Sequence, residues 1–266
     1  MDFLVISLLS AFIGAITLIS GFGLGTVLMP AFAVFFPIEV AIAATGVVHL
    51  SNNLFKLALV GKHAQRDIVL RFGVPAIIAA IIGAGLMALL TDRTPVATYT
   101  IGSITAKVTW LKMLIALLLA SFAALELWPR YKDLSFPPKM LPVGGALSGF
   151  FGGISGMQGA LRAPFLLRAG LTKDQYVGTA NVISTIVDCA RLLAYVAGFT
   201  WLAKTRDYTV LTETRTLLLV ASACIAGCAG SYLSSRYLKK MTLGSIRAVV
   251  SVLLFLFSIT LASGII

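Results

Sequence analysis

Ten apolar stretches, nearly free of charged residues, constrain the fold of this chain more than any other feature. They lie at residues 3–19, 24–36, 40–60, 68–90, 109–128, 140–151, 157–169, 175–199, 214–235 and 245–264. A helix that crosses the hydrocarbon core of a bilayer needs about 20 residues, and most of the stretches approach or exceed that length. The chain is 59% hydrophobic and 12% charged, against about 45–50% and about 25% in soluble domains. This excludes a soluble globular protein, and we predict an all-α polytopic protein of the cell membrane.

Three of the stretches, 24–36, 140–151 and 157–169, are too short to cross a bilayer alone. Residues 20–25 join the first of them to the stretch before it, and residues 152–159 join the other two to each other. Both joints are rich in glycine, which transmembrane helices tolerate at breaks and at close helix contacts. We expect each joint to connect the two pieces of a broken or re-entrant helix pair. Simple close packing of helices is the alternative.

The distribution of Lys and Arg selects between two topologies. If each broken pair returns to its starting side, the loops of one side carry twelve of the 21 basic residues and those of the other side carry six. If each pair crosses once, the division is nine and nine. The positive-inside rule favours the first topology, with both termini outside the cytoplasm. The net charge of +11 then reflects topology and does not indicate nucleic acid as a partner. In the outer loop 91–108, a loose alternation of side chains allows a small β-hairpin.

An internal repeat supports the same arrangement. Three positions recur 134 residues further on: Gly25, Pro30 and Thr45 match Gly159, Pro164 and Thr179. Each half, 1–134 and 135–266, contains a broken pair followed by three full spans. Because three is odd, the second half is inverted in the membrane, and the two halves form one transport domain. In inverted-repeat transporters the substrate binds near the midplane, where broken helices present their positive N-terminal ends. Such a site suits an anion.

Polar residues inside the apolar stretches form two stripes. The first contains Thr45, His49, Asn52 and Lys56 at helical spacing with Asn53 beside them, and the second contains Asn181, Thr185, Asp188 and Arg191. Arg162 lies in a short piece. Ionisable residues at membrane depth are costly and mark functional sites by default. The structural alternatives are a Lys56 side chain that reaches the interface, an intrahelical Asp188–Arg191 pair, and asparagines that join helices by hydrogen bonds.

The candidate anion site combines these residues with the glycine joints. We expect charge from Lys56, Arg162 and Arg191, and orientation from polar side chains. The candidate substrate-binding residues are Gly23, Gly25, His49, Asn52, Asn53, Lys56, Gly156, Gln158, Gly159, Arg162, Asn181, Thr185 and Arg191. An inside-negative potential favours anion exit by about 2.3 kcal/mol per charge per 100 mV, whereas uptake needs a coupled cation. His49 and Asp188 are the candidates for proton coupling.

Several other kinds of chemistry are not indicated. The chain has no cluster of residues at metal-ligand spacing and no phosphate-binding Gly-Lys-Ser or Gly-Lys-Thr, so we predict no metal, no cofactor and no enzymatic activity. The expected partners are a small anion and the lipid bilayer, with no nucleic acid, and a homodimer is left open. Two alternative functions remain: a thiol-redox conduit that uses Cys189, Cys224 and Cys228, or an anion channel.

The glycine-rich joints ahead of Pro30 and Pro164, each followed by a short linker and a span that opens near Thr45 or Thr179, resemble the sulfite exporter TauE/SafE family of membrane permeases. The resemblance covers nearly the whole chain, although this chain lacks the family's usual run of three consecutive glycines. It implies as substrate a small sulfur-containing anion, such as sulfite, or an organosulfonate, such as sulfoacetate. We therefore predict a secondary transporter for such an anion, working by alternating access as one repeat rocks against the other.

Overall fold

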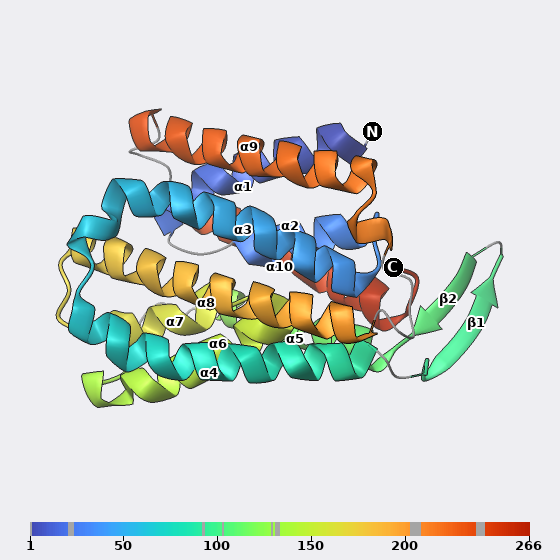
Figure 1. The fold of residues 1–266 in the computed structure, drawn as a ribbon, viewed down its shortest axis with the longest axis horizontal. Helices are drawn as coiled ribbons and strands as arrows, with labels where there is room; N and C mark the ends of the chain where they lie inside the picture. Colours follow the sequence, from blue (N-terminus) through green and yellow to red (C-terminus); the bar gives the residue numbers. More distant parts are fainter. Residues whose placement is uncertain are drawn as a thin grey trace.

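The computed structural model describes residues 2–20, 24–91, 94–102, 104–128, 130, 134–202, 209–237 and 243–266. The described residues form helices α1 (Asp2–Ser20), α2 (Leu24–Ala33), α3 (Ile38–Val60), α4 (Arg66–Thr91), α5 (Trp110–Leu127), α6 (Leu141–Ser155), α7 (Gly159–Leu166), α8 (Lys173–Leu202), α9 (Thr214–Tyr237) and α10 (Leu243–Ala262). Short 3-10 turns lie at Gly61–His63, Pro138–Met140 and Thr209–Leu211. The long helices lie roughly along one axis of the molecule (Figure 1).

Each of the ten apolar stretches corresponds to one of these helices, which confirms the prediction of an all-α polytopic membrane protein. Five segments of the described chain are long and apolar enough to cross a membrane: Ile38–His63, Arg66–Thr91, Trp110–Leu127, Lys173–Trp201 and Thr214–Ser234. Large apolar side chains cover their outer surfaces, as on α4, where Leu70 and Ile82 are among the exposed residues. Such a surface is compatible with lipid and not with water.

The helices predicted to be short are short. At a rise of 1.5 Å per residue, α2 spans about 15 Å and α7 about 12 Å, well under the roughly 30 Å of a bilayer core. The chain enters α1 at the end of the molecule where α3 also begins, so α1 and α2 together return to their starting end (Figure 1). The α6–α7 pair returns in the same way at the opposite end. Gly156, with a φ of 80°, stops α6 in a left-handed conformation that glycine adopts without strain.

A β-hairpin follows α4. Strands β1 (Ala97–Ile101) and β2 (Ile104–Val108) pair antiparallel, with Ala97 opposite Val108. The hairpin projects from the end of the molecule where both chain termini lie (Figure 1). The Lys107 amide donates to the Gly264 carbonyl oxygen at 3.0 Å, so β2 is tied to the C-terminus. The hairpin that the sequence allowed in this loop is therefore present.

The closest helix pairs join one half of the chain to the other. α1 packs along α9, α4 along α6, and α5 along α10. α3 lies between α8 and α9, and α8 lies between α3 and α4. Glycine makes the α4–α6 contact close: an ideal Cβ on Gly145, Gly149 or Gly153 would lie 2.1, 2.1 or 2.2 Å from a carbonyl oxygen of α4. This small-residue spacing brings transmembrane helix backbones into direct contact.

Candidate functional site

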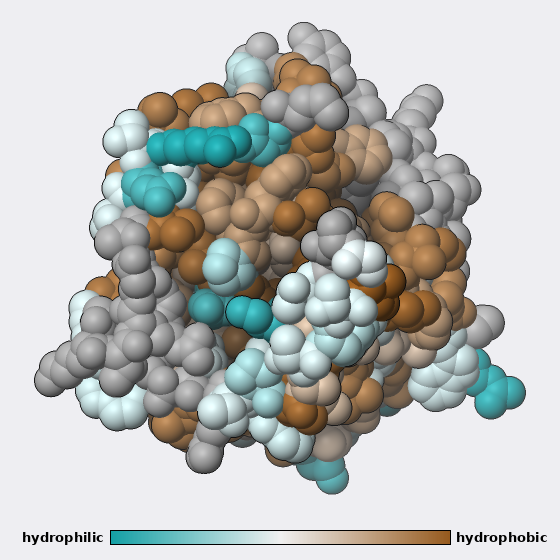
Figure 2. Space-filling model, turned by 90° about the vertical axis from the view of Figure 1, so that its right-hand side faces the viewer, coloured by the Kyte–Doolittle hydropathy of each residue, from teal (hydrophilic) through white to brown (hydrophobic). Residues whose placement is uncertain are grey.

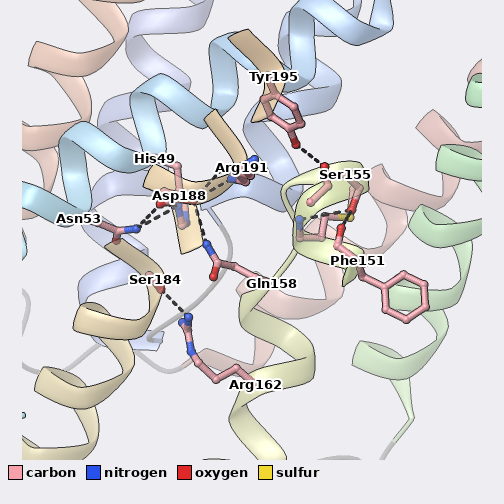
Figure 3. Close-up of polar contacts among 12 residues, drawn as sticks. His49, Asn53, Phe151, Ser155, Gln158, Arg162, Ser184, Asp188, Arg191 and Tyr195 are labelled. Atoms are coloured by element: carbon pink, nitrogen blue, oxygen red, sulfur yellow. Dashed lines mark hydrogen bonds and ion pairs between the residues drawn. The ribbon is translucent and has the colours of Figure 1, made fainter. Parts of the chain in front are cut away.

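The polar residues of the two stripes meet where α3 and α8 lie side by side (Figure 1). Asp188, on α8, is at the centre of the cluster, and its carboxylate is fully buried. Figure 3 shows His49 and Asn53 reaching it from α3, Gln158 from the α6–α7 joint, and Arg191 from the next turn of α8. We call these five residues the Asp188 cluster. Three separate parts of the chain converge on one carboxylate.

The two oxygens of Asp188 have different partners. Oδ1 accepts hydrogen bonds from Gln158 Nε2 and Arg191 Nε, both at 2.9 Å, and Arg191 Nη2 also lies 2.9 Å from it. Oδ2 accepts from Asn53 Nδ2 at 2.7 Å and lies 2.6 Å from His49 Nδ1. An ionised carboxylate can only accept, so Nδ1 of His49 carries the hydrogen in this arrangement. A buried carboxylate with this many charge-assisted bonds is well satisfied.

The guanidinium of Arg191 lies between two glycines. An ideal Cβ on Gly156 would be 2.9 Å from Arg191 Nη1, and one on Gly46 of α3 would be 3.5 Å from the same atom. Glycine backbone therefore lies on two sides of Nη1. Within the described residues, Nη1 has no hydrogen-bond partner, and neither does the nearby amide oxygen Gln158 Oε1. Arg191 is thus held by Asp188 on one edge and keeps a donor unused on the other.

Tyr195 supports this arrangement from one turn further along α8. Its hydroxyl donates to the Gly153 carbonyl oxygen at 2.5 Å, which ties α8 to the last turn of α6 (Figure 3). Arg191 Cζ lies 5.9 Å from the centroid of the tyrosine ring, within the range of a cation–π contact. One side chain therefore positions both the guanidinium and the glycine joint.

The remaining predicted residues surround the cluster. Arg162 of α7 donates to Ser184 Oγ of α8 (Figure 3), and Asn181 Nδ2 donates to the Asn53 carbonyl oxygen at 3.0 Å. Asn52 accepts from Ser231 of α9 at 2.7 Å, whereas Thr185 bonds within its own helix. Lys56 is buried one turn beyond Asn52. The predicted residues therefore divide between a central cluster and contacts to neighbouring helices.

The glycine candidates lie in different settings. Gly159 is the first residue of α7, Gly25 is the second residue of α2, and Gly156 stands beside Arg191. Gly23 lies outside the described residues. Sequence reasoning missed Gly46 and Tyr195 as neighbours of Arg191. Tyr195 lies one helical turn after Arg191, so its position next to Arg191 could have been predicted from helical spacing. The position of Gly46 next to Arg191 depends on the packing of α3 against α8 and could not.

The three cysteines lie on α8 and α9. All three are free thiols, with Cys189 exposed on α8 and the other two half-buried on α9. Cys228 Sγ lies 3.7 Å from Ser51 Oγ. Over the part of the chain that the structure describes, no group of three or more His, Cys, Asp or Glu side chains could hold a metal ion.

The buried charges are unbalanced. Among the described residues, the buried ionic side chains are Lys56, Arg162 and Arg191 against the single carboxylate of Asp188. Such an excess of buried positive charge favours the binding of an anion. Figure 2, which views the end with the hairpin, shows a few hydrophilic side chains near its middle, with hydrophobic residues above them and residues of intermediate hydropathy beside them.

Comparison with known proteins identifies a family model that matches this chain. The model described as "Sulfite exporter TauE/SafE" matches residues 6–261 of this chain, nearly its whole length. None of the curated proteins and none of the solved structures compared with the chain matches it.

Proposed function

The chain belongs to the sulfite exporter TauE/SafE family of membrane permeases, and on that basis we propose that it carries sulfite, or an organosulfonate such as sulfoacetate, across the cell membrane by alternating access. The observation that carries the proposal is the excess of buried cations over buried carboxylates among the described residues. An anion bound there would partly offset this excess of buried positive charge.

We place the anion at the free edge of Arg191, between Gly46 and Gly156. An Nη1 hydrogen is available there, and the glycine walls let a compact anion approach the guanidinium closely. A sulfite or sulfonate group carries three oxygens that accept charge-assisted hydrogen bonds. Arg162 and Lys56 are buried as well and supply further positive charge.

We also propose that residues 1–134 and 135–266 form two inverted repeats. The order of the elements supports this: a helix that ends at a joint, a short helix and three longer helices occur in α1–α5 and again in α6–α10. The pairs α1–α2 and α6–α7 return to opposite ends of the molecule (Figure 1). With the more basic loops in the cytoplasm, the termini and the hairpin lie outside.

The inside-negative membrane potential suffices for export of an anion, by about 2.3 kcal/mol per charge per 100 mV. Uptake would need a coupled cation, and the His49–Asp188 contact is the proton site that we propose for it. An imposed pH gradient tests this coupling. If sulfite flux into liposomes is the same with and without the gradient, at equal membrane potential, proton coupling is wrong.

The test of the proposed function is sulfite transport by the purified full chain in liposomes. We expect saturable uptake of labelled sulfite that speeds up when the liposomes are preloaded with unlabelled sulfite, because a carrier returns faster when loaded, whereas a channel shows no such counterflow. Sulfoacetate should compete, and acetate, which lacks the sulfonate group, should compete weakly. If the uptake of both sulfite and sulfoacetate is no greater than into protein-free liposomes, the proposal is wrong.

A further inference from the structure

We propose that the bodies that move during transport are two composite bundles, not the two halves of the sequence. The first bundle consists of α1, α2, α3 and α9, and the second of α4, α6, α7 and α8, so each takes one helix from the other half of the chain. The seam between them is the α3–α8 contact, and Asp188 is the residue that latches it. This inference rests on the proposed transport function and concerns the motion that serves it.

The first bundle is joined along the full length of α1 and α9. Asp2 pairs with Arg215 near one end, Ser7 Oγ donates to Ser222 Oγ at 3.2 Å further along, and Ser231 Oγ lies 2.8 Å from the Gly14 carbonyl oxygen beyond that. The backbones touch as well, since a Cβ on Gly230 would lie 1.9 Å from a carbonyl oxygen of α1. These contacts leave little room for α1 and α9 to slide apart.

α3 belongs to this bundle through α9. Ser231, which reaches α1 on one side, lies 2.7 Å from Asn52 Oδ1 of α3 on the other. Cys228, one turn earlier, lies beside Ser51. α2 packs on both α1 and α3. A single serine of α9 therefore bridges α1 and α3, which come from the opposite half of the chain.

The second bundle is joined through glycine. Gly145, Gly149 and Gly153 of α6 face the carbonyl oxygens of Phe72, Ala76 and Ala80 of α4 at successive turns. Tyr195 ties α8 to α6, and Arg162 ties α7 to α8. Backbone contacts of this kind cannot be exchanged for water or for another side chain, so this bundle moves as one piece or not at all.

The seam differs from both interiors because a fully buried carboxylate holds it at its centre. Oδ1 of Asp188 is bound inside the second bundle, by Gln158 and Arg191, whereas Oδ2 is bound across the seam, by His49 and Asn53. Asn181 also crosses the seam, to the Asn53 carbonyl oxygen. Separation of α3 from α8 would cost the Oδ2 contacts and leave the Oδ1 contacts in place.

The seam is also closed by backbone near one of its ends. Near the ends of the helices that face away from the termini, a Cβ on Gly178 of α8 would lie 2.6 Å from the Val60 carbonyl oxygen, and Gln65 N donates to Thr179 Oγ1 at 2.9 Å. The structure is thus closed tightly at this end of the seam, ten residues of α8 before Asp188.

Distances between spin labels on exposed residues separate the two kinds of moving body. In a chain with its three cysteines replaced by serine, we would label Leu4 with Leu233 (α1 and α9), Leu89 with Val143 (α4 and α6), and Leu4 with Leu70 (α1 and α4), all exposed positions. The first two pairs lie within a composite bundle but join different sequence halves. The third lies within one sequence half but joins different bundles.

We expect sulfite to shift only the third distance, between α1 and α4. A shift of the first two distances with a constant third would show that the sequence halves move as bodies and would overturn the proposal. Sulfite counterflow is measured on the same labelled proteins. If a labelled protein transports sulfite while all three distances stay fixed, the proposal of two moving bundles is wrong, although the proposed transport function still holds. Absence of counterflow in the wild-type chain contradicts the function itself.

Asp188→Asn provides the second test, because it weakens the latch without adding bulk. We expect the α1–α4 distance distribution to broaden in this variant without sulfite, while the α1–α9 and α4–α6 distributions stay as in the wild type. Asp67→Asn, at an exposed position of α4, is the matched control and should leave all three unchanged. An α1–α4 distribution in Asp188→Asn identical to the wild type would show that Asp188 is no latch.

Discussion

The α4–α6 and α3–α8 interfaces bring helices together by opposite means. α4 and α6 meet backbone to backbone through glycines at every fourth position, with almost no side chain between them. α3 and α8 meet at their centre through a carboxylate, a histidine, amides and a guanidinium, held by hydrogen bonds that water could replace. The α4–α6 interface is thus backbone against backbone at three successive turns, whereas the centre of the α3–α8 interface is polar.

This difference indicates where each kind of residue is useful in a membrane protein. Small residues give close packing without polar groups, so they suit the contacts that must not change. Ionisable residues are expensive at membrane depth, so their concentration at one seam marks the place where exchange of partners contributes to function. Substitutions in the α4–α6 interface and in the α3–α8 interface should therefore have different effects on the protein.

The largest effect is expected from Gly149→Leu in the α4–α6 contact. Even a Cβ there lies 2.1 Å from the Ala76 carbonyl oxygen, so the helices must separate, at more than the roughly 1–3 kcal/mol of ordinary overpacking. We expect no monodisperse protein in size-exclusion chromatography. Gly85→Leu on α4, where nothing lies within 4 Å of the added Cβ, is the control and should behave as wild type. A stable Gly149→Leu protein would contradict the rigid interface.

Next in size is the effect of breaking the buried pair at the seam. Asp188→Asn leaves Arg191 uncompensated, which costs about 3–5 kcal/mol for a buried pair. Arg191→Gln should cost less, because the carboxylate keeps His49 and Asn53. The double variant should regain most of the stability, since a neutral pair of similar shape is often tolerated. The apparent melting temperatures of the two single variants and of the double variant measure these changes in stability.

The exposed pair Asp67 and Arg71, 3.1 Å apart on α4, is the control for that series. Its neutralised double variant should change stability by less than about 1 kcal/mol, as is usual for surface pairs. Equal losses in the two series would mean that the Asp188–Arg191 pair has no special environment.

A smaller effect is expected at the joint. Gly156→Ala places a methyl group 2.9 Å from Arg191 Nη1 at a positive φ, which costs about 1–3 kcal/mol in backbone strain and crowds the anion. Gly102→Ala, in the hairpin turn with a φ of 60° and an open surrounding, bears similar strain away from the site. We expect both to lose stability but only Gly156→Ala to weaken sulfite binding in calorimetry. Equal sulfite affinity in the two variants would remove Gly156 from the site.

The smallest effect is expected from Tyr195→Phe. It removes one hydrogen bond to the Gly153 carbonyl, worth about 1 kcal/mol, and keeps the ring beside Arg191. Tyr99→Phe, which removes a hydroxyl contact between the hairpin and Ser263, is the control. We expect a small loss of sulfite affinity in Tyr195→Phe alone; identical affinities in both would limit Tyr195 to a structural role.

Sequence reasoning was strongest where a pattern is local. The ten helices follow from the lengths of the apolar stretches, and the two stripes from helical spacing, so His49 and Asp188 could each be placed on a polar helix face before their contact was known. Contacts set by packing could not be foreseen. Gly46 looks like any glycine in a membrane helix until α8 is laid against it, and the pairing of α1 with α9 depends on the whole bundle.

The most direct test of the proposed anion site is sulfite counterflow in liposomes that contain the double variant Asp188→Asn, Arg191→Gln, with the double variant Asp67→Asn, Arg71→Gln in parallel. We expect both proteins to fold, the exposed-pair variant to transport at the wild-type rate, and the transport rate of the buried-pair variant to fall at least 100-fold, about 2.7 kcal/mol. A folded buried-pair variant with wild-type counterflow would contradict the proposed anion site.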